Sequence, residues 1–345
     1  MTTPALLRDL LLAVGPSGHE EPAARIWRDA AAAFAEVHTD SLGTSYARVR
    51  AAGENAPTLA VIGHIDEIGF QVTHIDEAGL LSFAIVGGFR AEVLLGQRVQ
   101  IVGRDGMVPG VVSAGELGEG KLKHPELHID IGAKDADEAA TLVRPGDPGV
   151  WKGDPVELAG GRITSKSLDN RLGAYIALEA ARRVAAAGNA VYDVVAVAAA
   201  QEEIGLHGAR AAAYGLEPAI ALAIDVTYAT DAPGGNPKRA GKVELGSGVA
   251  ITRGPVVHPR VVDLLVAAAE RESIPHTFEV YSGATHTDAD AVHISRSGIP
   301  TGLLSIPLRY MHSPCEVASL DDVEAVIALV VAFARGLDAD TSLTR

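Results

Sequence analysis

The chain has a single cysteine and no long apolar run, and each shortage excludes a class of protein. With Cys315 alone among 345 residues, no disulfide can form within the chain, which is typical of a reducing compartment. No apolar run reaches the roughly 18 uncharged residues that a membrane-spanning helix needs. The N-terminal segment does not resemble a signal peptide, because Arg8 and Asp9 interrupt its short apolar stretch. We therefore expect a cytoplasmic protein without a membrane partner.

Basic and aromatic residues are also scarce. The sequence has 29 Lys and Arg against 44 Asp and Glu, a formal net charge of −15. Because nucleic-acid binding needs a basic face, we expect no nucleic-acid partner. Aromatic residues make up only 4% of the chain while hydrophobic residues make up 48%, and the small residues Ala, Val and Gly favour helices packed tightly on a sheet.

The pattern of elements changes twice along the chain. Residues 1–70 and 164–345 alternate strands with helices, which predicts an α/β fold with a mostly parallel sheet and helices on both faces. Residues 71–163 contain short alternating stretches separated by Gly, Asp and Pro turns, which predicts a small inserted β domain. The α/β domain is therefore expected to be discontinuous.

The expected elements follow from the same pattern. Helices are expected at residues 4–14, 20–36, 136–143, 170–187, 207–214 and 259–272, with a last helix capped by Ser319 and ending near 334. Strands are expected at residues 58–62, 80–86, 98–102, 108–113, 192–200, 219–224, 277–281 and 300–306, and a flexible loop at 115–125.

Glu202 and Glu203 follow directly after the apolar run that ends at Ala200. Two charges have no place in a buried strand unless they are paired or bound to a metal. An isolated Glu pair is usually solvated at the start of a helix. Just past the end of a strand, however, two carboxylates can face a pocket together.

Further candidate ligands occur at equivalent places. In open α/β sheets, functional groups collect outside the carboxyl ends of the strands. His64, Asp225 and His312 follow three other predicted strands, and Asp169 begins a helix. Each has an ordinary structural explanation when taken alone, such as a buried histidine, a turn or a helix cap. Their convergence on one edge of one sheet favours a metal site.

The donor set indicates the chemistry. Two imidazoles and three carboxylates suit two borderline divalent ions, with one carboxylate shared. Such a pair of ions activates a water and polarises a carbonyl. Hydrolysis also needs a proton carrier that does not bind metal, which accounts for two adjacent glutamates.

Five short segments carry these residues. They are His64-Ile65-Asp66-Glu67-Ile68-Gly69, Ser167-Leu168-Asp169-Asn170-Arg171, Gln201-Glu202-Glu203-Ile204-Gly205, Ile224-Asp225-Val226 and Arg309-Tyr310-Met311-His312-Ser313-Pro314. Their content and order resemble the motifs of the dinuclear metallo-aminopeptidases of the glutamyl-aminopeptidase family, which includes the tetrahedral (TET) aminopeptidases and some proteins once labelled endoglucanases. The resemblance runs from Gly15-Pro16-Ser17-Gly18 to His312 and covers nearly the whole chain.

The resemblance implies a fold and an assembly. The fold is a zinc-peptidase-like catalytic domain interrupted by a β-barrel-like dimerisation domain. The activity is removal of N-terminal residues from short peptides with two zinc or cobalt ions. The assembly is a homo-oligomer, either a dimer or a tetrahedral dodecamer.

It also implies a role for each site residue. Asp169 would bridge the two ions, and the Asp169–Asn170 peptide bond would be cis. One ion would be completed by His64 and Asp225, and the other by Glu203 and His312. Glu202 would be the general base and then the general acid. Asp66 would orient the His64 imidazole from behind, as such supporting groups commonly do.

Three questions stay open in the sequence. His286 interrupts a segment that resembles the family's Gly-Gly-Thr-Asp-Ala motif, and it either contacts substrate or lies in a solvated loop. Lys238, Arg239, Lys242 and Arg253 either select an acidic side chain or are solvated. The same site could instead serve a deacylase of acylated amino acids, or the fold could be kept in a non-catalytic assembly protein. A non-catalytic assembly protein would be expected to have lost candidate ligands, and none of them is lost.

Overall fold

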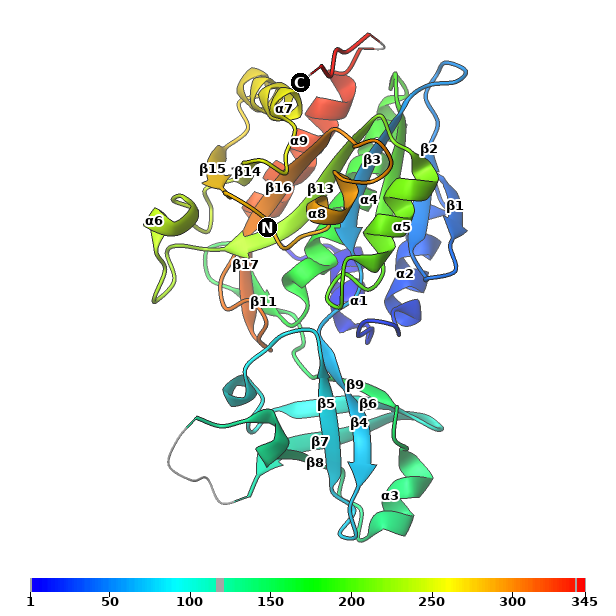
Figure 1. Cartoon of the computed structure of the whole chain (residues 1–345), viewed down its shortest axis with the longest axis vertical. Coiled ribbons are helices and arrows are strands. Elements are labelled where there is room, and N and C mark those ends of the chain that lie inside the picture. The colour runs from blue at the N-terminus through cyan, green and yellow to red at the C-terminus, as the bar shows by residue number, and fades with distance from the viewer. Residues whose placement is uncertain (1, 116–120, 339, 345) are drawn as a thin grey trace.

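The computed structural model describes residues 2–115, 121–338 and 340–344, in which an α/β domain and a β barrel are distinct (Figure 1). The expectation of an α/β fold with a mostly parallel sheet, interrupted by a small β-barrel-like unit, is confirmed. No helix among these residues is long and apolar enough to cross a membrane.

The α/β domain is built on an eight-stranded sheet within the described residues. In spatial order its strands are β1 (Glu36–Thr39), β2 (Ser45–Val49), β12 (Asp193–Ala199), β3 (Thr58–His64), β13 (Ile220–Tyr228), β16 (Thr301–Leu308), β14 (Val249–Arg253) and β15 (His276–Val280). The four central strands β12, β3, β13 and β16 are parallel to one another. Their carboxyl ends therefore lie at one edge of the sheet.

Helices cover both faces of this sheet, as its alternating side chains require. In β3, Leu59 and Val61 join one apolar cluster, while Ala60 and Ile62 join another on the opposite face. The first face is covered by α1 (Ala5–Leu12), α2 (Glu21–Ala31), α4 (Leu168–Ala187), α7 (Pro259–Arg271) and α9 (Leu320–Arg335). The second face carries α5 (His207–Leu216) and α8 (Ala289–Val292), and the short α6 (Pro237–Ala240) follows β13 (Figure 1).

The inserted domain is a closed barrel with its own apolar core. Its strands, in spatial order, are β4 (Gly69–Ile75), β5 (Leu81–Val86), β8 (Leu127–Asp130), β7 (Gly106–Ala114), β6 (Arg98–Gly103) and β9 (Pro148–Trp151). The helix α3 (Ala136–Leu142) and the 3-10 turns Ala91–Val93 and His124–Glu126 lie between them. Of the loop expected at 115–125, residues 116–120 lie outside the described residues.

A small sheet joins the return from the barrel to the end of the chain. Strands β10 (Val156–Leu158), β11 (Arg162–Ser165) and β17 (Glu316–Ser319) form it, with β11 in the middle. Residues 156–163 fall within the range expected for the insertion. However, β10 pairs with β11, and β11 in turn pairs with β17, the strand that precedes α9.

Several boundaries differ from the sequence-based expectation. The helix expected at 20–36 ends at Ala31, and Glu36 already belongs to β1, where it pairs with Arg48 of β2. Within the eight-stranded sheet, the strands β1, β2 and β14 were not expected. Ser319 stands at the N-cap position of α9 without a side-chain capping bond, and its backbone pairs with that of Arg162 between β17 and β11.

Candidate metal centre

The expected ligands meet at the carboxyl ends of the four central parallel strands. His64 is the last residue of β3, Glu202 and Glu203 follow β12, and His312 lies in the loop after β16. Asp225 lies inside β13 rather than after it, because that strand continues to Tyr228. Asp169 lies in the first turn of α4.

Asp169 lies between the two imidazoles. Its Oδ1 is 3.2 Å from His64 Nε2, and its Oδ2 is 3.2 Å from His312 Nε2. Burial alone would raise the pKa of Asp169, but its contacts with His312 and His64 hold that pKa below the ordinary range. One carboxylate that presents each oxygen to a different histidine has the arrangement that a shared metal ligand requires.

The remaining ligand atoms form two overlapping groups. His64, Asp169 and Glu203 offer atoms within 4.8 Å of one another, and so do His64, Glu202 and Asp225. His312 Nε2 is also 3.6 Å from Glu203 Oε1. The structure thus brings all five expected ligands together, with His64 in both groups and Glu202 beside Asp225 rather than apart from the ligands.

The electrostatics of the cluster suit cations. Burial raises the pKa of Glu202 to about 10 and the pKa values of Glu203 and Asp225 well above their ordinary range, with His64 opposing the shift in each case. Glu203 Oε1 is buried without a hydrogen-bond partner among the described residues. Divalent ions would stabilise the ionised carboxylates, so this donor set fits them.

Asp66 supports three site residues at once. Its carboxylate accepts the backbone N–H groups of Glu202 at 3.0 Å and Glu203 at 3.2 Å. Its Oδ1 is 3.3 Å from His64 Nδ1, and Ser17 Oγ donates to its Oδ2 at 2.6 Å. Asp66 is fully buried. The expected contact with His64 is therefore present, and the contacts with the glutamate backbone are additional.

Two glycines allow α4 to approach the strands closely. A Cβ on Gly63 would lie 2.3 Å from the carbonyl carbon of Gly173, and one on Gly173 would lie 2.6 Å from the carbonyl oxygen of Ile224. Asn170 adds a direct link, since its Nδ2 donates to that same oxygen at 2.8 Å. Asp169–Asn170 is a cis peptide bond, as the resemblance implied. The start of α4 is thereby held beside β3 and β13.

Glu316 was not expected to take part in the site. It is 2% exposed, and it accepts the backbone N–H groups of Asp169 at 3.1 Å and His312 at 2.9 Å. A glutamate four residues after a candidate ligand is only a weak signal in a sequence. Its position depends on the pairing of Ser165 in β11 with Glu316 in β17.

A second group of buried charges lies behind the site. Glu67 accepts Lys166 Nζ at 2.6 Å and Arg171 Nη2 at 3.3 Å, and all three side chains are buried. Gly15 N also donates to Glu67, at 3.0 Å. This cluster connects the N-terminal segment, the residues after β3 and the start of α4.

The open candidates lie at the surface. His286 is exposed, and so are Lys238, Arg239, Lys242 and Arg253. Arg253 places its guanidinium over the Phe278 ring, 3.9 Å from the centroid. For these residues the structure favours the solvated alternative.

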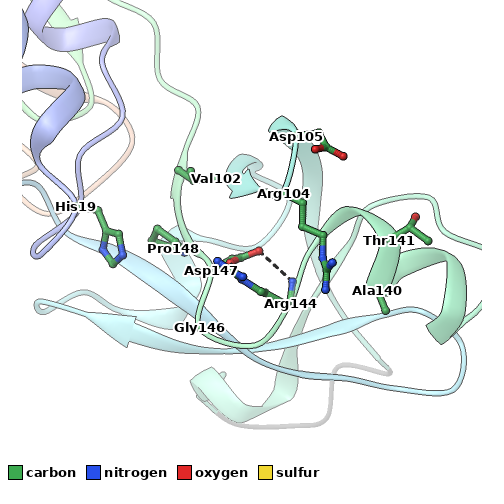
Figure 2. Close-up of a pocket in the computed structure, with 11 residues that line it drawn as sticks. His19, Val102, Arg104, Asp105, Ala140, Thr141, Arg144, Gly146, Asp147 and Pro148 are labelled. Atoms are coloured by element: carbon green, nitrogen blue, oxygen red, sulfur yellow. Dashed lines mark hydrogen bonds and ion pairs between the residues drawn. The ribbon is translucent and has the colours of Figure 1, made fainter.

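A pocket of about 700 Å³ lies mainly on the barrel. Figure 2 shows the residues that line it. It is lined mainly by barrel residues such as Arg104, Thr141 and Arg144, together with His19. Arg144 pairs with Asp147 at 3.0 Å. None of the expected site residues lines this pocket, so it is separate from the metal centre.

Comparison with known proteins agrees with this geometry. The family model for M42 glutamyl aminopeptidases matches residues 43–329. The chain belongs to that family. It is 34% identical to a lysyl aminopeptidase of Pyrococcus furiosus over 95% of each chain, and 29% identical to a glutamyl aminopeptidase of Lactococcus lactis over 82% of this chain and 81% of that one.

Solved structures of the family have the same fold. An aminopeptidase from the archaeon Desulfurococcus kamchatkensis superposes with a TM-score of 0.91 at 34% identity, covering 97% of this chain and 95% of that one. The TET1 peptidase of Pyrococcus horikoshii, described as assembling into a tetrahedron or a large octahedral shell, gives 0.86 at 30% identity and covers 96% and 99%. The predicted family is confirmed, and the chain is an M42-type hydrolase of the aminopeptidase class.

Proposed function

We propose that the protein is a dinuclear metallo-aminopeptidase that removes N-terminal residues from short peptides. The observation that carries this proposal is the Asp169 carboxylate, whose two oxygens each lie 3.2 Å from a different histidine. When bound, a pair of zinc or cobalt ions supplies an activated water and polarises the peptide carbonyl. His64 and Asp225 would hold one ion, Glu203 and His312 the other, and Asp169 both.

Glu202 would move the proton. Its side chain is about 10% exposed and lies 3.8 Å from His64 Nε2. Without cations its pKa is raised to about 10 by burial. Divalent ions nearby would lower that pKa, and the ionised carboxylate could then take a proton from water and deliver it to the leaving amine. Asp66 would orient His64 and fix the backbone that carries Glu202.

The preferred N-terminal residue is a separate question. By their names, the lysyl and glutamyl aminopeptidases that resemble this chain remove N-terminal residues of opposite charge. Among the described residues, no contact joins the four exposed basic residues near α6 and β14 to the candidate ligands. We therefore propose an aminopeptidase without assigning its side-chain preference.

Metal analysis coupled to a panel of aminoacyl-nitroanilides, with and without a chelator, tests the proposal. We expect two divalent ions per chain and activity that is lost with the chelator and restored by zinc or cobalt. Glu202→Gln should keep both ions and lose turnover. Normal turnover of this variant with metals bound would contradict the assignment of the base.

The alternative amide hydrolase is distinguished by substrate. Acylated amino acids should not be cleaved, because the proposal requires a free α-amine. Cleavage of acylated amino acids together with no release from any free-amine substrate would favour a deacylase.

We also propose a cytoplasmic homo-oligomer. The single cysteine supports a reducing compartment. The barrel insertion and the described assembly of the Pyrococcus horikoshii relative support self-association through the barrel, as a dimer or as a tetrahedral dodecamer.

A further inference from the structure

Asp288 is a buried carboxylate to which the proposed chemistry gives no role. It precedes α8, the short helix that packs on β13 and β16 beside the metal centre. It is 2% exposed, and neither carboxylate oxygen has a hydrogen-bond partner among the described residues. Buried polar groups are normally paired, so an unpaired carboxylate calls for a partner outside the chain.

The loop before α8 fixes the place of Asp288 without using its side chain. Asp290 accepts the backbone N–H groups of Thr285 and His286, both at 2.9 Å, and the Thr285 hydroxyl at 2.7 Å. Thr287 Oγ1 accepts the N–H of Ala289 at 3.2 Å and so serves the start of the helix. Asp288 stands at the N-cap position but makes no capping bond.

Asp225 alternates along β13 with Ile224 and Val226, whose side chains join the cluster on the first face of the sheet. Its side chain therefore lies on the second face, where α8 packs against β13.

The charge of Asp288 raises the pKa values of Glu202 and Asp225. Burial raises the pKa of Asp288 to about 7, and among its neighbours His64 lowers it while Asp66 raises it. His64 already contacts Asp169 and Asp66. A cationic ligand would supply the missing partner.

We propose that Asp288 binds the free α-ammonium of the peptide substrate and so restricts the enzyme to N-terminal residues. This inference rests on the proposed function and deepens it. An ammonium group carries three donors and one positive charge, which match an unpaired carboxylate. A peptide with a blocked N-terminus offers neither, so it would leave Asp288 buried and unpaired.

Two matched hydroxamates test the assignment by binding rather than by turnover. One is the hydroxamate of leucine, and the other is 4-methylpentanohydroxamate, which lacks only the α-amine. Both chelate metal ions, so calorimetry on the zinc-loaded protein can measure both affinities. Wild type should prefer the amine-bearing compound roughly 10- to 100-fold, the range expected of a charged hydrogen bond.

Asp288→Asn should abolish this preference and leave the affinity for the compound without the amine unchanged. Asp290→Asn is the matched control, because it disturbs the same loop without removing the proposed partner. It should change both affinities alike and keep their ratio. An unchanged ratio in Asp288→Asn would overturn the proposal.

A structure of the wild type with leucine hydroxamate gives a second test that does not depend on the folding of a variant. The α-nitrogen should lie about 3 Å from an Asp288 oxygen. A nitrogen bound only to a metal ion would overturn the proposal. If the amine preference is found but no peptide substrate is cleaved, the proposed function fails while the ammonium site stands.

Discussion

Asp66 accepts a hydrogen bond from the backbone N–H of Glu202 at 3.0 Å, although 136 residues separate the two. The same oxygen lies 3.3 Å from His64 Nδ1. One buried carboxylate therefore sets the ring of a candidate ligand and the backbone of the candidate base together. The end of β3 and the loop after β12 are fixed relative to each other by this contact.

Replacing Asp66 with Asn should weaken metal binding and activity. An amide keeps one acceptor oxygen but turns its NH₂ group toward the N–H of either Glu202 or Glu203. Loss of such a supporting group typically costs about 10- to 100-fold in metal affinity or activity. Calorimetric titration with zinc measures the first quantity. Ser17→Ala removes only the 2.6 Å hydrogen bond to Asp66 and should have a smaller effect. Equal zinc affinities in wild type and Asp66→Asn would contradict this role.

Glu316→Gln should reduce occupancy of the ion that we propose is held by Glu203 and His312. The carboxylate accepts the N–H groups of Asp169 and His312 with separate oxygens, and Gln replaces one of these acceptors with a donor. We expect two zinc ions per wild-type chain after dialysis and fewer in the variant, measured by elemental analysis. Glu324→Gln, on the exposed side of α9, provides a control that should retain both ions. Full occupancy in Glu316→Gln would contradict the prediction.

Much of the centre could be predicted because strand direction links sequence to space. Once alternating strands and helices indicate a parallel sheet, residues that follow its strands must share an edge. His64, Glu202 and Glu203 were placed by this argument alone, and the structure brings them together. Asp225 was placed at the same edge although its strand extends three residues beyond it.

The supporting residues could not be predicted because they depend on pairings that no local pattern shows. Glu316 reaches Asp169 only because β17 pairs with β11, and 147 residues separate the two. In the sequence, Glu67 is only one more charged residue after His64. In the structure it is buried and pairs with Lys166. Strand β2, which lies between β1 and β12, mixes Ser, Tyr, Ala, Arg and Val without clear alternation, so it gave no strand signal.

Glu67→Gln should destabilise the fold strongly. It leaves the buried Lys166 ammonium without the carboxylate that lies 2.6 Å away. Removing one partner of a buried pair typically costs about 3–5 kcal/mol in unfolding free energy. Urea denaturation should show a lower midpoint. Glu36→Gln, which breaks an exposed pair with Arg50, should leave the midpoint nearly unchanged. Similar midpoints for the two variants would show that the buried cluster adds no stability.

Glu279 should make stability depend on pH. It is fully buried on β15, where Thr252 and Ser305 hydroxyls each donate to its Oε1 at 2.5 Å. Burial raises its pKa above the ordinary value near 4.5. The stability that the protonated form contributes is therefore present below about pH 4.5 and is lost as the pH rises through the folded-state pKa. Glu279→Gln does not titrate, so its melting temperature relative to wild type should increase between pH 5 and pH 8. A constant difference across that range would contradict the assigned direction.

Self-association should depend on the outer face of the barrel. Met107 and Val111 of β7 are 45% and 46% exposed, and Val102 of β6, which pairs with Met107, is 38% exposed. Apolar side chains gathered on one face favour a contact with another copy of the chain.

Val111→Asp places a charge within this face and should lower the mass measured by light scattering to that of a smaller assembly or a monomer. Val191→Asp is the matched control, because Val191 is 40% exposed but lies between α4 and β12, away from the barrel. Its mass should equal that of the wild type. If Val111→Asp also keeps the wild-type mass, the chains associate through another surface, and the barrel has a role other than self-association.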